Sequence, residues 1–560
     1  MAASELLDYV LQEKAHAEEE IRRLTNLPEE TQVEKGLLVP EMTLVKQDGN
    51  ELLFSCSVNH SRVKPGDRVE LCRSGKWEAC TVIENLQDEI TVLIKDLGKS
   101  YPQDQPYQLR VVHYQLLEPV IATLEGMRDG APGKGFWDTL FGEKAIKPKG
   151  LGGLTASAAI NLLEGRELNS TQLLAAQRIL AKPSLLAVQG PPGTGKTRLL
   201  ASVTQAFIQK KQRIAVLAPT HQAVNNALSV IAEACPDLQA FKIGEKLKSS
   251  GLSEKVHTRT IAQFNSDCRK KKIAPNVVGM TFYSAITNLG LRSSPFAPNI
   301  ILVDEAGQLP LSYGALTGTF GAGSVVCFGD DAQLPPIFQG ELESHSCSKS
   351  LFSAIRSSNP DAIVALDLSY RMNSEICSLI SRNYYRTADG QEFLKTSNKI
   401  SGDLSLPLSA EIEPWIHTVI NSDKSVHHLT QFSDDNCQQE NAGEAQAIAK
   451  LASAYLRSGG SPDELIIVAP YRKQISVIKS CLRQLWDGTF PAIDSVERVQ
   501  GLGADFVIIS MTSSDFFHIR DNEKFLCSPN RLNVALSRAK RKVVVFIHGN
   551  IEPQIGIDWH

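Results

Sequence analysis

The stretch from Gly190 to Thr197 reads GPPGTGKT and fits the phosphate-binding pattern G-x-x-x-x-G-K-[ST]. An apolar run, LLAVQG, leads into it, and TRLLASVTQAFIQK follows as an expected helix, which is the context that a true phosphate loop requires. Backbone N–H groups of the glycines and the helix N-terminus would then face phosphate oxygens. Lys196 would reach the β- and γ-phosphates of a nucleoside triphosphate, and Thr197 would coordinate Mg²⁺. The predicted loop residues are Gly190, Pro191, Pro192, Gly193, Thr194, Gly195, Lys196 and Thr197.

Two carboxylates end a second apolar run, NIILV. Ligands bind at the carboxyl ends of parallel strands, so we expect Asp304 to hold Mg²⁺ through water. Glu305 could orient and deprotonate an attacking water, as a general base must. A third run, SVVCFGD, is followed by Gln333, which we expect to sense the γ-phosphate or to position water. The alternatives are an ordinary acidic pair and a simple turn.

The elements that would position these residues are short, almost wholly apolar runs that alternate with expected helices from Leu168 onward. Such runs are typical of parallel strands covered by helices on both faces. The first set is LLAVQG, RIAVLAPT, NVVGMT, NIILVDEA and SVVCFGD, and the second is AIVALDLS, ELIIVAP, DFVIISMTS and KVVVFIHG. The sequence therefore predicts an α/β protein with two similar domains, at 165–343 and 344–560.

The first 164 residues have a different character. Residues 3–25 form an amphipathic pattern at helical spacing, so we expect a stalk helix within 1–36. Short β-branched runs separated by turns predict a small β-barrel over 37–118. A linker and stalk return, with a short helix around Phe136 to Phe141, would occupy 119–164.

Two basic sets lie outside the predicted triphosphate site. The segment 242–272 is expected to be a basic insert in the first α/β domain and ends in Arg269-Lys270-Lys271-Lys272. Each set could be a solvated surface or a contact to nucleic-acid phosphates. The second set flanks the turns of the expected barrel and consists of Arg62, Lys64, Arg68, Arg73 and Lys76.

Composition narrows the class of protein. The formal net charge is -4, so any nucleic-acid binding must use a local basic surface. The 11 cysteines form no C-x-x-C pair and do not cluster with the 12 histidines, which argues against zinc or iron–sulfur sites and fits a reducing compartment. The N-terminus is no secretory signal, and the longest apolar runs are strand-sized. We expect a soluble intracellular monomer, cytoplasmic or nuclear (or nucleoid), without a membrane partner.

These segments, taken in order, resemble superfamily 1 helicases, and specifically the 5′→3′ branch (superfamily 1B) that includes the up-frameshift and senataxin RNA helicases, the immunoglobulin-mu-binding helicase and related DNA helicases. The resemblance covers about residues 165 to 550. It implies two RecA-like P-loop domains in tandem, with the stalk helix and the barrel as accessory elements. The matching segments are LNSTQ from Leu168, GPPGTGKT, APTHQAVNNA from Ala218, VVGMTFYSA from Val277, DEAGQ from Asp304, GDDAQLPP from Gly329, LSYRMN from Leu368, VAPYRKQ from Val468, VERVQGLGADFVIIS from Val496 and NRLNVALSRAK from Asn530.

The resemblance implies roles that spacing alone does not supply. ATP would lie between the two domains with Mg²⁺, Gln172 would read the adenine, and Tyr370 would stack on it. Arg371 and Arg538 would reach across from the second domain as arginine fingers, because charge spreads over the γ-phosphate oxygens in the transition state. The alternative for both arginines is a surface ion pair.

The resemblance also implies contacts to a nucleic-acid strand, mainly to phosphate and sugar and so largely blind to sequence. The hydroxyl of Thr220 could equally cap a helix, and both roles are compatible. The family commonly has an acidic residue where this chain has Gly503, which puts one ribose or coupling contact in doubt. The implied strand contacts are Pro219, Thr220, Thr281, Ser495 and Arg498.

The function that these features favour is an ATP-dependent 5′→3′ helicase or translocase on single-stranded nucleic acid, with DNA favoured over RNA. An RNA helicase, and an ATP-gated clamp or protein-displacing remodeller without productive unwinding, would use the same motifs. A triphosphatase unrelated to nucleic acid is disfavoured by the segments at Ala218, Val496 and Asn530. No cluster of carboxylates with a lysine that would suggest a nuclease is visible outside the helicase-like segments.

Overall fold

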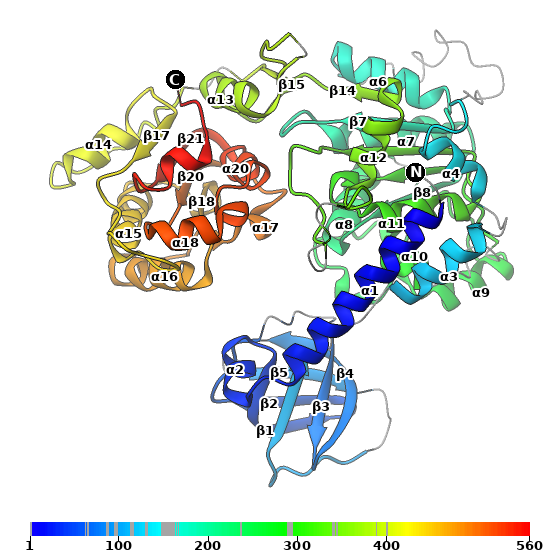
Figure 1. Cartoon of the computed structure of the whole chain (residues 1–560), viewed down its shortest axis with the longest axis horizontal. Coiled ribbons are helices and arrows are strands. Elements are labelled where there is room, and N and C mark those ends of the chain that lie inside the picture. Colours follow the sequence, from blue (N-terminus) through cyan, green and yellow to red (C-terminus); the bar gives the residue numbers. More distant parts are fainter. Residues whose placement is uncertain are drawn as a thin grey trace.

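The computed structural model describes residues 3–61, 63, 67–85, 89–94, 99–111, 117–128, 133–146, 163, 165, 167–235, 238–287, 295–338, 342, 345–387, 389–398 and 401–559. Two α/β domains lie side by side, and a small barrel stands away from them at the end of the long helix α1 (Figure 1). We call the α/β domain with the phosphate loop domain 1 and the other domain 2.

The helix α1 (Ala3–Thr25) links the barrel to domain 1. Leu6, Tyr9 and Val10, near its start, are buried in one cluster with α3 (Leu117–Arg128) and with side chains of domain 1. Its other end leads through α2 (Glu29–Glu34) into the barrel (Figure 1). The predicted stalk helix is therefore confirmed, and its apolar face packs as amphipathic spacing requires.

The barrel is closed, as predicted, in the order β1-β2-β5-β4-β3-β6. Closure pairs every strand on both sides and leaves no open edge. A separate core fills it, in which the rings of Phe54 and Tyr107 lie 5.1 Å apart. Of the basic residues expected near its turns, Arg62 and Lys64 lie outside the described residues. The strands are β1 (Leu38–Asp48), β2 (Glu51–Cys56), β3 (Arg68–Arg73), β4 (Lys76–Asn85), β5 (Glu89–Ile94) and β6 (Tyr107–Val111).

Domain 1 is built on an eight-stranded sheet in the order β10-β9-β11-β8-β12-β13-β7-β14. All neighbouring strands run parallel, as the apolar runs predicted. The strands are β7 (Leu185–Gln189), β8 (Ile214–Ala218), β9 (Ala240–Ile243), β10 (Val256–Arg259), β11 (Val277–Thr281), β12 (Ile300–Val303), β13 (Ser324–Gly329) and β14 (Ile363–Ala365).

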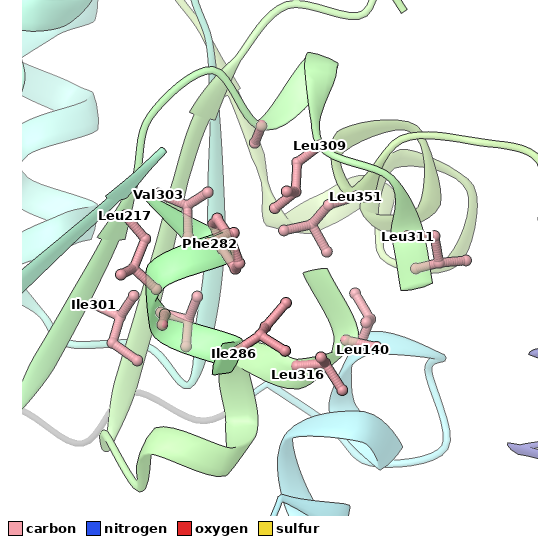
Figure 2. Close-up of a cluster of buried hydrophobic side chains, with 14 of the residues drawn as sticks. Leu140, Leu217, Phe282, Ile286, Ile301, Val303, Leu309, Leu311, Leu316 and Leu351 are labelled. Atoms are coloured by element: carbon pink, nitrogen blue, oxygen red, sulfur yellow. The ribbon is translucent and has the colours of Figure 1, made fainter. Parts of the chain in front are cut away.

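Helices cover both faces of this sheet and bury two separate hydrophobic clusters. The first face carries α6 (Ser170–Leu180), α7 (Lys196–Gln209) and α8 (His221–Ala234). On the other face Leu140, Leu316 and Leu351 lie in one cluster with Val303 of the sheet (Figure 2). The elements of this second face include α4 (Lys134–Leu140), α9 (Ile261–Arg269), α10 (Phe282–Thr287), α11 (Leu311–Gly314), α12 (Leu351–Ser358) and the 3₁₀ turns η3 (Ala306–Gln308), η4 (Ala315–Phe320) and η6 (Pro360–Ala362).

The predicted boundary between residues 343 and 344 is wrong. Val364 of β14 pairs with Val188 of β7, so domain 1 continues through β14. The helix α12 packs on the domain 1 sheet through Leu351 (Figure 2). The run AIVALDLS, which we assigned to the second set, thus supplies an edge strand of the first sheet. A short apolar run predicts a buried strand but contains no information on which sheet it joins.

The segment 242–272 is also not an insert between strands. It begins inside β9 and contains all of β10, so the edge strand β10 and the end of its neighbour β9 belong to it. Lys242 is buried, its Nζ donates to the Lys248 carbonyl, and burial lowers its pKa to about 8. The exposed cations are Lys246, Lys255 and the four residues 269–272 at the end of α9. Lys248 Nζ lies 3.7 Å from Oδ1 of Asp67 in the barrel.

Domain 2 has a five-stranded parallel sheet in the order β17-β21-β20-β18-β19, again with a hydrophobic cluster on each face. A two-stranded sheet, β15 (Leu368–Ser369) and β16 (Lys395–Thr396), lies next to the crossing from domain 1. The main strands are β17 (Val426–Leu429), β18 (Leu465–Val468), β19 (Ala492–Asp494), β20 (Ala504–Ser510) and β21 (Ala539–Phe546). The helices are α13 (Ser374–Tyr384), α14 (Pro414–Ile420), α15 (Ala442–Arg457), α16 (Arg472–Leu485), α17 (Val496–Val499), α18 (Phe516–Asp521), α19 (Glu523–Leu526), α20 (Pro529–Leu536) and α21 (Glu552–Ile555).

Across the part of the chain that the structure describes, no helix combines the length and the apolar character needed to cross a membrane.

Candidate active site

The phosphate loop joins β7 to α7, as predicted. Gly193 and Gly195 have φ angles of 75° and 77°, in the left-handed region where glycine is favoured. A Cβ on Gly190 would overlap the Lys196 side chain, which folds across it and donates its Nζ to the Gly190 carbonyl. The loop therefore places a lysine and the N-terminus of a 14-residue helix at one concave backbone segment, which suits phosphate oxygens.

Asp304 and Glu305 follow β12, which lies one strand away from β7 across β13. Asp304 is buried, and burial together with the neighbouring Glu305 raises its pKa, whereas Lys196 lowers it. Glu305 has a φ of 53°, which is uncommon for a residue other than glycine, and backbone strain of this kind clusters at functional sites. The Glu305 carboxylate accepts a hydrogen bond at Oε2 from Gln308 Nε2 at 3.1 Å.

These residues fit ATP and Mg²⁺. Burial destabilises the charged form of Asp304, and a cation beside it would restore that form. Thr197 is half-buried in the first turn of α7, and its hydroxyl would be available to a Mg²⁺ ion there. Within the described ranges, no group of three or more His, Cys, Asp and Glu residues could hold a metal. A Mg²⁺ ion bound mainly by substrate phosphates and water does not need one.

Domain 2 contacts the phosphate loop directly. The backbone N–H of Tyr370 donates to the Gly193 carbonyl at 2.9 Å, and Ser369 Oγ donates to the Pro192 carbonyl at 3.0 Å. A Cβ on Gly193 would lie 2.6 Å from the Cβ of Arg371. The predicted residues Tyr370 and Arg371 are therefore at the loop, although they lie about 180 residues further along the chain.

The two predicted arginine fingers lie together. Arg371 donates through Nη1 to the Ser537 carbonyl at 3.3 Å. Arg538 is buried and donates through Nη1 to the Leu502 carbonyl at 3.1 Å. Burial and then the charge of Arg371 lower the pKa of Arg538, while Glu305 of domain 1 raises it. The two guanidinium groups and the Glu305 carboxylate thus share one electrostatic environment across the domain boundary.

Gln172 lies under the phosphate loop. It is 1 % exposed, and its Nε2 donates to the Thr194 carbonyl at 2.9 Å. Its Oε1 accepts from the backbone N–H of Asn169, which completes a capping box at the start of α6. Asn169 also donates to the hydroxyl of Tyr370 at 3.0 Å, and the Tyr370 side chain is exposed. The predicted adenine-binding pair is therefore joined through Asn169.

Gln333 follows β13 and is held within its own segment. Its Nε2 donates to Asp330 Oδ2 at 2.7 Å. Three partners of this segment were missed by sequence reasoning: Tyr385, Asn530 and Asn533, all in domain 2. The doubled aspartate before Gln333 and the two asparagines in NRLN were the signals that could have indicated them.

The residues that we predicted to contact a nucleic-acid strand lie at or near the starts of helices. Thr220 is exposed and accepts from the backbone N–H of Ala223, so the capping alternative holds in the structure. Pro219 beside it is half-buried. Thr281 is 2 % exposed and caps α10 through Ser284, so its side chain has little free surface.

In domain 2 the predicted contacts Ser495 and Arg498 lie at the start of α17 and within it. Ser495 is the N-cap residue without a side-chain capping bond, and Arg498 lies 3.8 Å from Asp494 in an ion pair. A Cβ on Gly503 would lie 3.2 Å from Arg371 Nε. An acidic side chain at position 503 would therefore lie beside the predicted arginine finger Arg371. The contact of these residues with a strand stays a prediction.

Comparison with known proteins agrees with this geometry. Residues 167–363 and residues 347–550 each match a family model described as an AAA domain. The two matches correspond broadly to domain 1 and domain 2 and overlap at residues 347–363, which contain α12 and η6.

Curated relatives are helicases. The chain is 30% identical over 420 residues to the DNA replication ATP-dependent helicase/nuclease DNA2 of Mus musculus, which covers 69% of this chain and 37% of the relative. The protein of the same name from Schizosaccharomyces pombe is 30% identical over 404 residues, covering 68% of this chain and 27% of the relative. The chain thus spans little more than a third of the length of these relatives, or less. The crystal structure of an arterivirus nonstructural protein 10 (helicase) is 12% identical to this chain, with a TM-score of 0.41. The match covers 92% of this chain and 80% of that one, and we base no conclusion on a likeness this weak.

The two AAA-domain matches and the helicase relatives support a superfamily 1 helicase family for residues 167–550. The P-loop, the ordered motifs and the parallel sheets of the two domains are consistent with that class.

Proposed function

We propose that this protein is an ATP-dependent 5′→3′ helicase or translocase on single-stranded nucleic acid, with DNA favoured over RNA. One observation carries the proposal: residues of domain 2 lie directly against the phosphate loop of domain 1. Tyr370 and Ser369 bond to its carbonyls, and the backbone of Arg371 adjoins Gly193. A nucleotide in that loop therefore contacts both domains, which a nucleotide-driven motor requires.

The chemistry of the site follows from charge. Lys196 and the N-terminus of α7 would neutralise the phosphates, and Glu305 would orient and deprotonate the attacking water. Arg371 and Arg538 would stabilise the charge that spreads over the γ-phosphate oxygens in the transition state. Thr197 and Asp304 would hold Mg²⁺, which supplies further charge neutralisation when bound.

The arrangement also converts hydrolysis into movement. Arginine fingers of domain 2 meet phosphates on domain 1 only when the cleft is closed, so the bound nucleotide biases closure. A strand held at Thr220 in domain 1 and at Arg498 in domain 2 would be shifted in each cycle. Such contacts to phosphate and sugar would be largely independent of base sequence.

The preference for DNA and the polarity rest on resemblance. The printed names of the mouse and S. pombe relatives describe helicase/nucleases of DNA replication, which supports DNA as the substrate. The motif set resembles the 5′→3′ branch of the superfamily. Because the chain spans 37% of the mouse relative, we propose only the helicase activity for it.

The test is steady-state ATP hydrolysis without polynucleotide, with single-stranded DNA and with single-stranded RNA, using Glu305→Gln as the blank. Duplexes with a 5′ or a 3′ tail then report strand displacement. We expect stimulation by DNA and displacement from the 5′-tailed duplex. Stimulated hydrolysis without a displaced strand from either duplex would replace the helicase by an ATP-gated clamp, and an ATPase indifferent to every polynucleotide would exclude both.

A further inference from the structure

A loop of domain 1 is embedded in domain 2. Residues 330–334, which we call the sensor loop, follow β13 and include Gln333. The Leu334 side chain belongs to a hydrophobic cluster of domain 2 that contains Met372 and Ile376, and Ala332 packs against the same cluster. The loop is therefore attached to domain 1 through β13 and packed into the core of domain 2.

A chain of buried hydrogen bonds accompanies this packing. Tyr385, directly after α13 of domain 2, donates its hydroxyl to Asp330 Oδ2 at 2.5 Å. Asn533 of α20 donates through Nδ2 to the Tyr385 hydroxyl at 2.9 Å and to the Ala332 carbonyl at 2.7 Å. All three polar side chains are buried, so each of these bonds is shielded from water.

The backbone of the sensor loop is held a second time. Asn530 of α20 donates through Nδ2 to the Asp331 carbonyl at 3.0 Å and to the Gln333 carbonyl at 2.6 Å. Within domain 1, Arg356 of α12 binds the Asp331 carboxylate with both Nε and Nη2. Domain 1 thus fixes one side of the loop, and two asparagines and one tyrosine of domain 2 fix the other.

One oxygen joins this chain to the predicted sensor. Asp330 Oδ2 accepts both from the Tyr385 hydroxyl at 2.5 Å and from Gln333 Nε2 at 2.7 Å. Burial raises the pKa of Asp330, while its hydrogen bonds to Tyr385 and Gln333 lower it. A buried carboxylate keeps the orientation in which its donors are satisfied, so the position of Tyr385 determines where Asp330 holds the Gln333 carboxamide.

We propose that Tyr385 is a positioning residue through which domain 2 sets the orientation of Gln333, by way of Asp330. The inference rests on the proposed function and on the prediction that Gln333 senses the γ-phosphate of bound ATP or positions water. When domain 2 moves, Tyr385 moves with α13, and the shared carboxylate oxygen transmits that movement to the sensor loop. Hydrolysis is then possible only in the arrangement of the two domains that presents Gln333 correctly.

Tyr385→Phe tests this, because it removes the hydroxyl and keeps the ring. The neighbouring Tyr384 offers a matched control, since its buried hydroxyl finds no hydrogen-bond partner among the residues that the structure describes. We expect the maximal ATP hydrolysis rate of Tyr385→Phe to fall roughly tenfold at a nearly unchanged KM for ATP. Tyr384→Phe should stay within about twofold of the parent protein, and an equally small loss in Tyr385→Phe would overturn the proposal.

A double-mutant cycle with Gln333→Ala separates positioning from a general structural role. If Tyr385 acts through Gln333, then Tyr385→Phe has no further effect on the rate once Gln333 is alanine. If the losses of the two substitutions multiply, Tyr385 acts independently of Gln333 and the proposal is wrong. The rates are measured with and without single-stranded DNA, so the cycle does not depend on stimulation.

A measurement without catalysis distinguishes this inference from the proposed function. Amide hydrogen exchange in the sensor loop should be faster in Tyr385→Phe than in Tyr384→Phe or the parent protein, because the loop loses its tie to domain 2. If the parent protein hydrolyses no ATP, the proposed function is wrong. Faster exchange in Tyr385→Phe would still show that Tyr385 holds the sensor loop. Unchanged exchange would overturn the inference whatever the enzyme does.

Discussion

Domain 1 and domain 2 share one architecture but carry different predicted site residues. Both are parallel sheets with a hydrophobic cluster on each face. The pattern G-x-x-x-x-G-K-[ST] occurs once in the sequence, in domain 1, whereas the predicted arginine fingers lie in domain 2. Domain 1 alone would lack the cations for the transition state, and domain 2 alone would lack the site that holds the phosphates. The comparison shows that two domains with the same architecture can carry different functional residues.

Two buried carboxylates make the same contrast. Glu444 at the start of α15 in domain 2 accepts from Ser510 Oγ at 2.5 Å, from the Thr512 backbone at 2.9 Å and from Ser433 Oγ at 2.8 Å. Asp304 in domain 1 faces Lys196 and the phosphate loop. The protein itself surrounds Glu444 with donors, which indicates a structural group, whereas Asp304 is a predicted Mg²⁺ ligand. Burial raises the pKa of both, so a raised pKa alone does not separate the two roles.

The division of labour is tested most strongly by removing a finger. We expect Arg371→Ala to lower the maximal ATP hydrolysis rate by about 10³-fold, because the developing γ-phosphate charge loses its partner from domain 2. The KM for ATP should change little, since domain 1 holds the ground state. Arg520→Ala, on the exposed side of α18, is the control in the same domain and should leave the rate unchanged. A full rate in Arg371→Ala would place the essential cation elsewhere.

The complementary loss in domain 1 is Glu305→Gln. Removal of the general base should reduce hydrolysis by about 10²- to 10³-fold while a fluorescent ATP analogue still binds. Lys196→Ala should instead weaken binding of the same analogue, because it removes a cation from the phosphates. Equal binding losses in both variants would mean that Glu305 supports the loop and does not act on water.

The structural role of Glu444 predicts a pH effect on stability in domain 2. Burial raises its pKa from 4.5 to about 7, so between these values the folded protein holds a proton that the unfolded chain releases. Folding is therefore favoured at the acid end, and the free energy of unfolding falls by about 3 kcal/mol as the pH rises from about 4.5 to about 7. Urea unfolding across this range should show that fall in the parent protein and a flatter profile in Glu444→Gln.

The exposed Glu411 provides the control for that experiment. Glu411→Gln should retain the pH dependence of the parent protein, because it leaves the buried Glu444 in place. A profile in Glu444→Gln that falls as steeply as in the parent protein would assign the pH effect to other groups.

The smallest expected effects come from substitutions at the starts of two helices, where Thr220 and Ser495 are predicted to contact the nucleic-acid strand. Thr220→Ala in domain 1 removes a capping bond of 3.2 Å to Ala223 and should cost about 1 kcal/mol of stability. Ser495→Ala in domain 2 removes no capping bond and should be close to neutral. Both substitutions should weaken binding of a labelled single strand, and Thr220→Ser should restore both properties in domain 1. A loss of stability without a loss of binding would leave Thr220 as a cap alone.

Local pattern predicted much of this molecule. The stalk helix, the closed barrel, the parallel strands and the loop around Lys196 are where spacing and composition put them. Apolar periodicity and glycine placement act over a few residues, and a linear sequence displays them directly. The domain boundary and the position of β14 were missed, because which sheet an apolar strand joins depends on partners far along the chain.

The sequence by itself determined the kinds of chemistry available here: a phosphate loop, two carboxylates, a sensor glutamine and two arginines in a specific order. Only the tertiary structure decided which of them meet. Arg371 adjoins Gly193, and Tyr385 shares an oxygen of Asp330 with Gln333, because loops of domain 1 contact domain 2. Contacts of this kind depend on the relative orientation of the two domains, and that orientation is set by packing over the whole interface and not by any local run of residues.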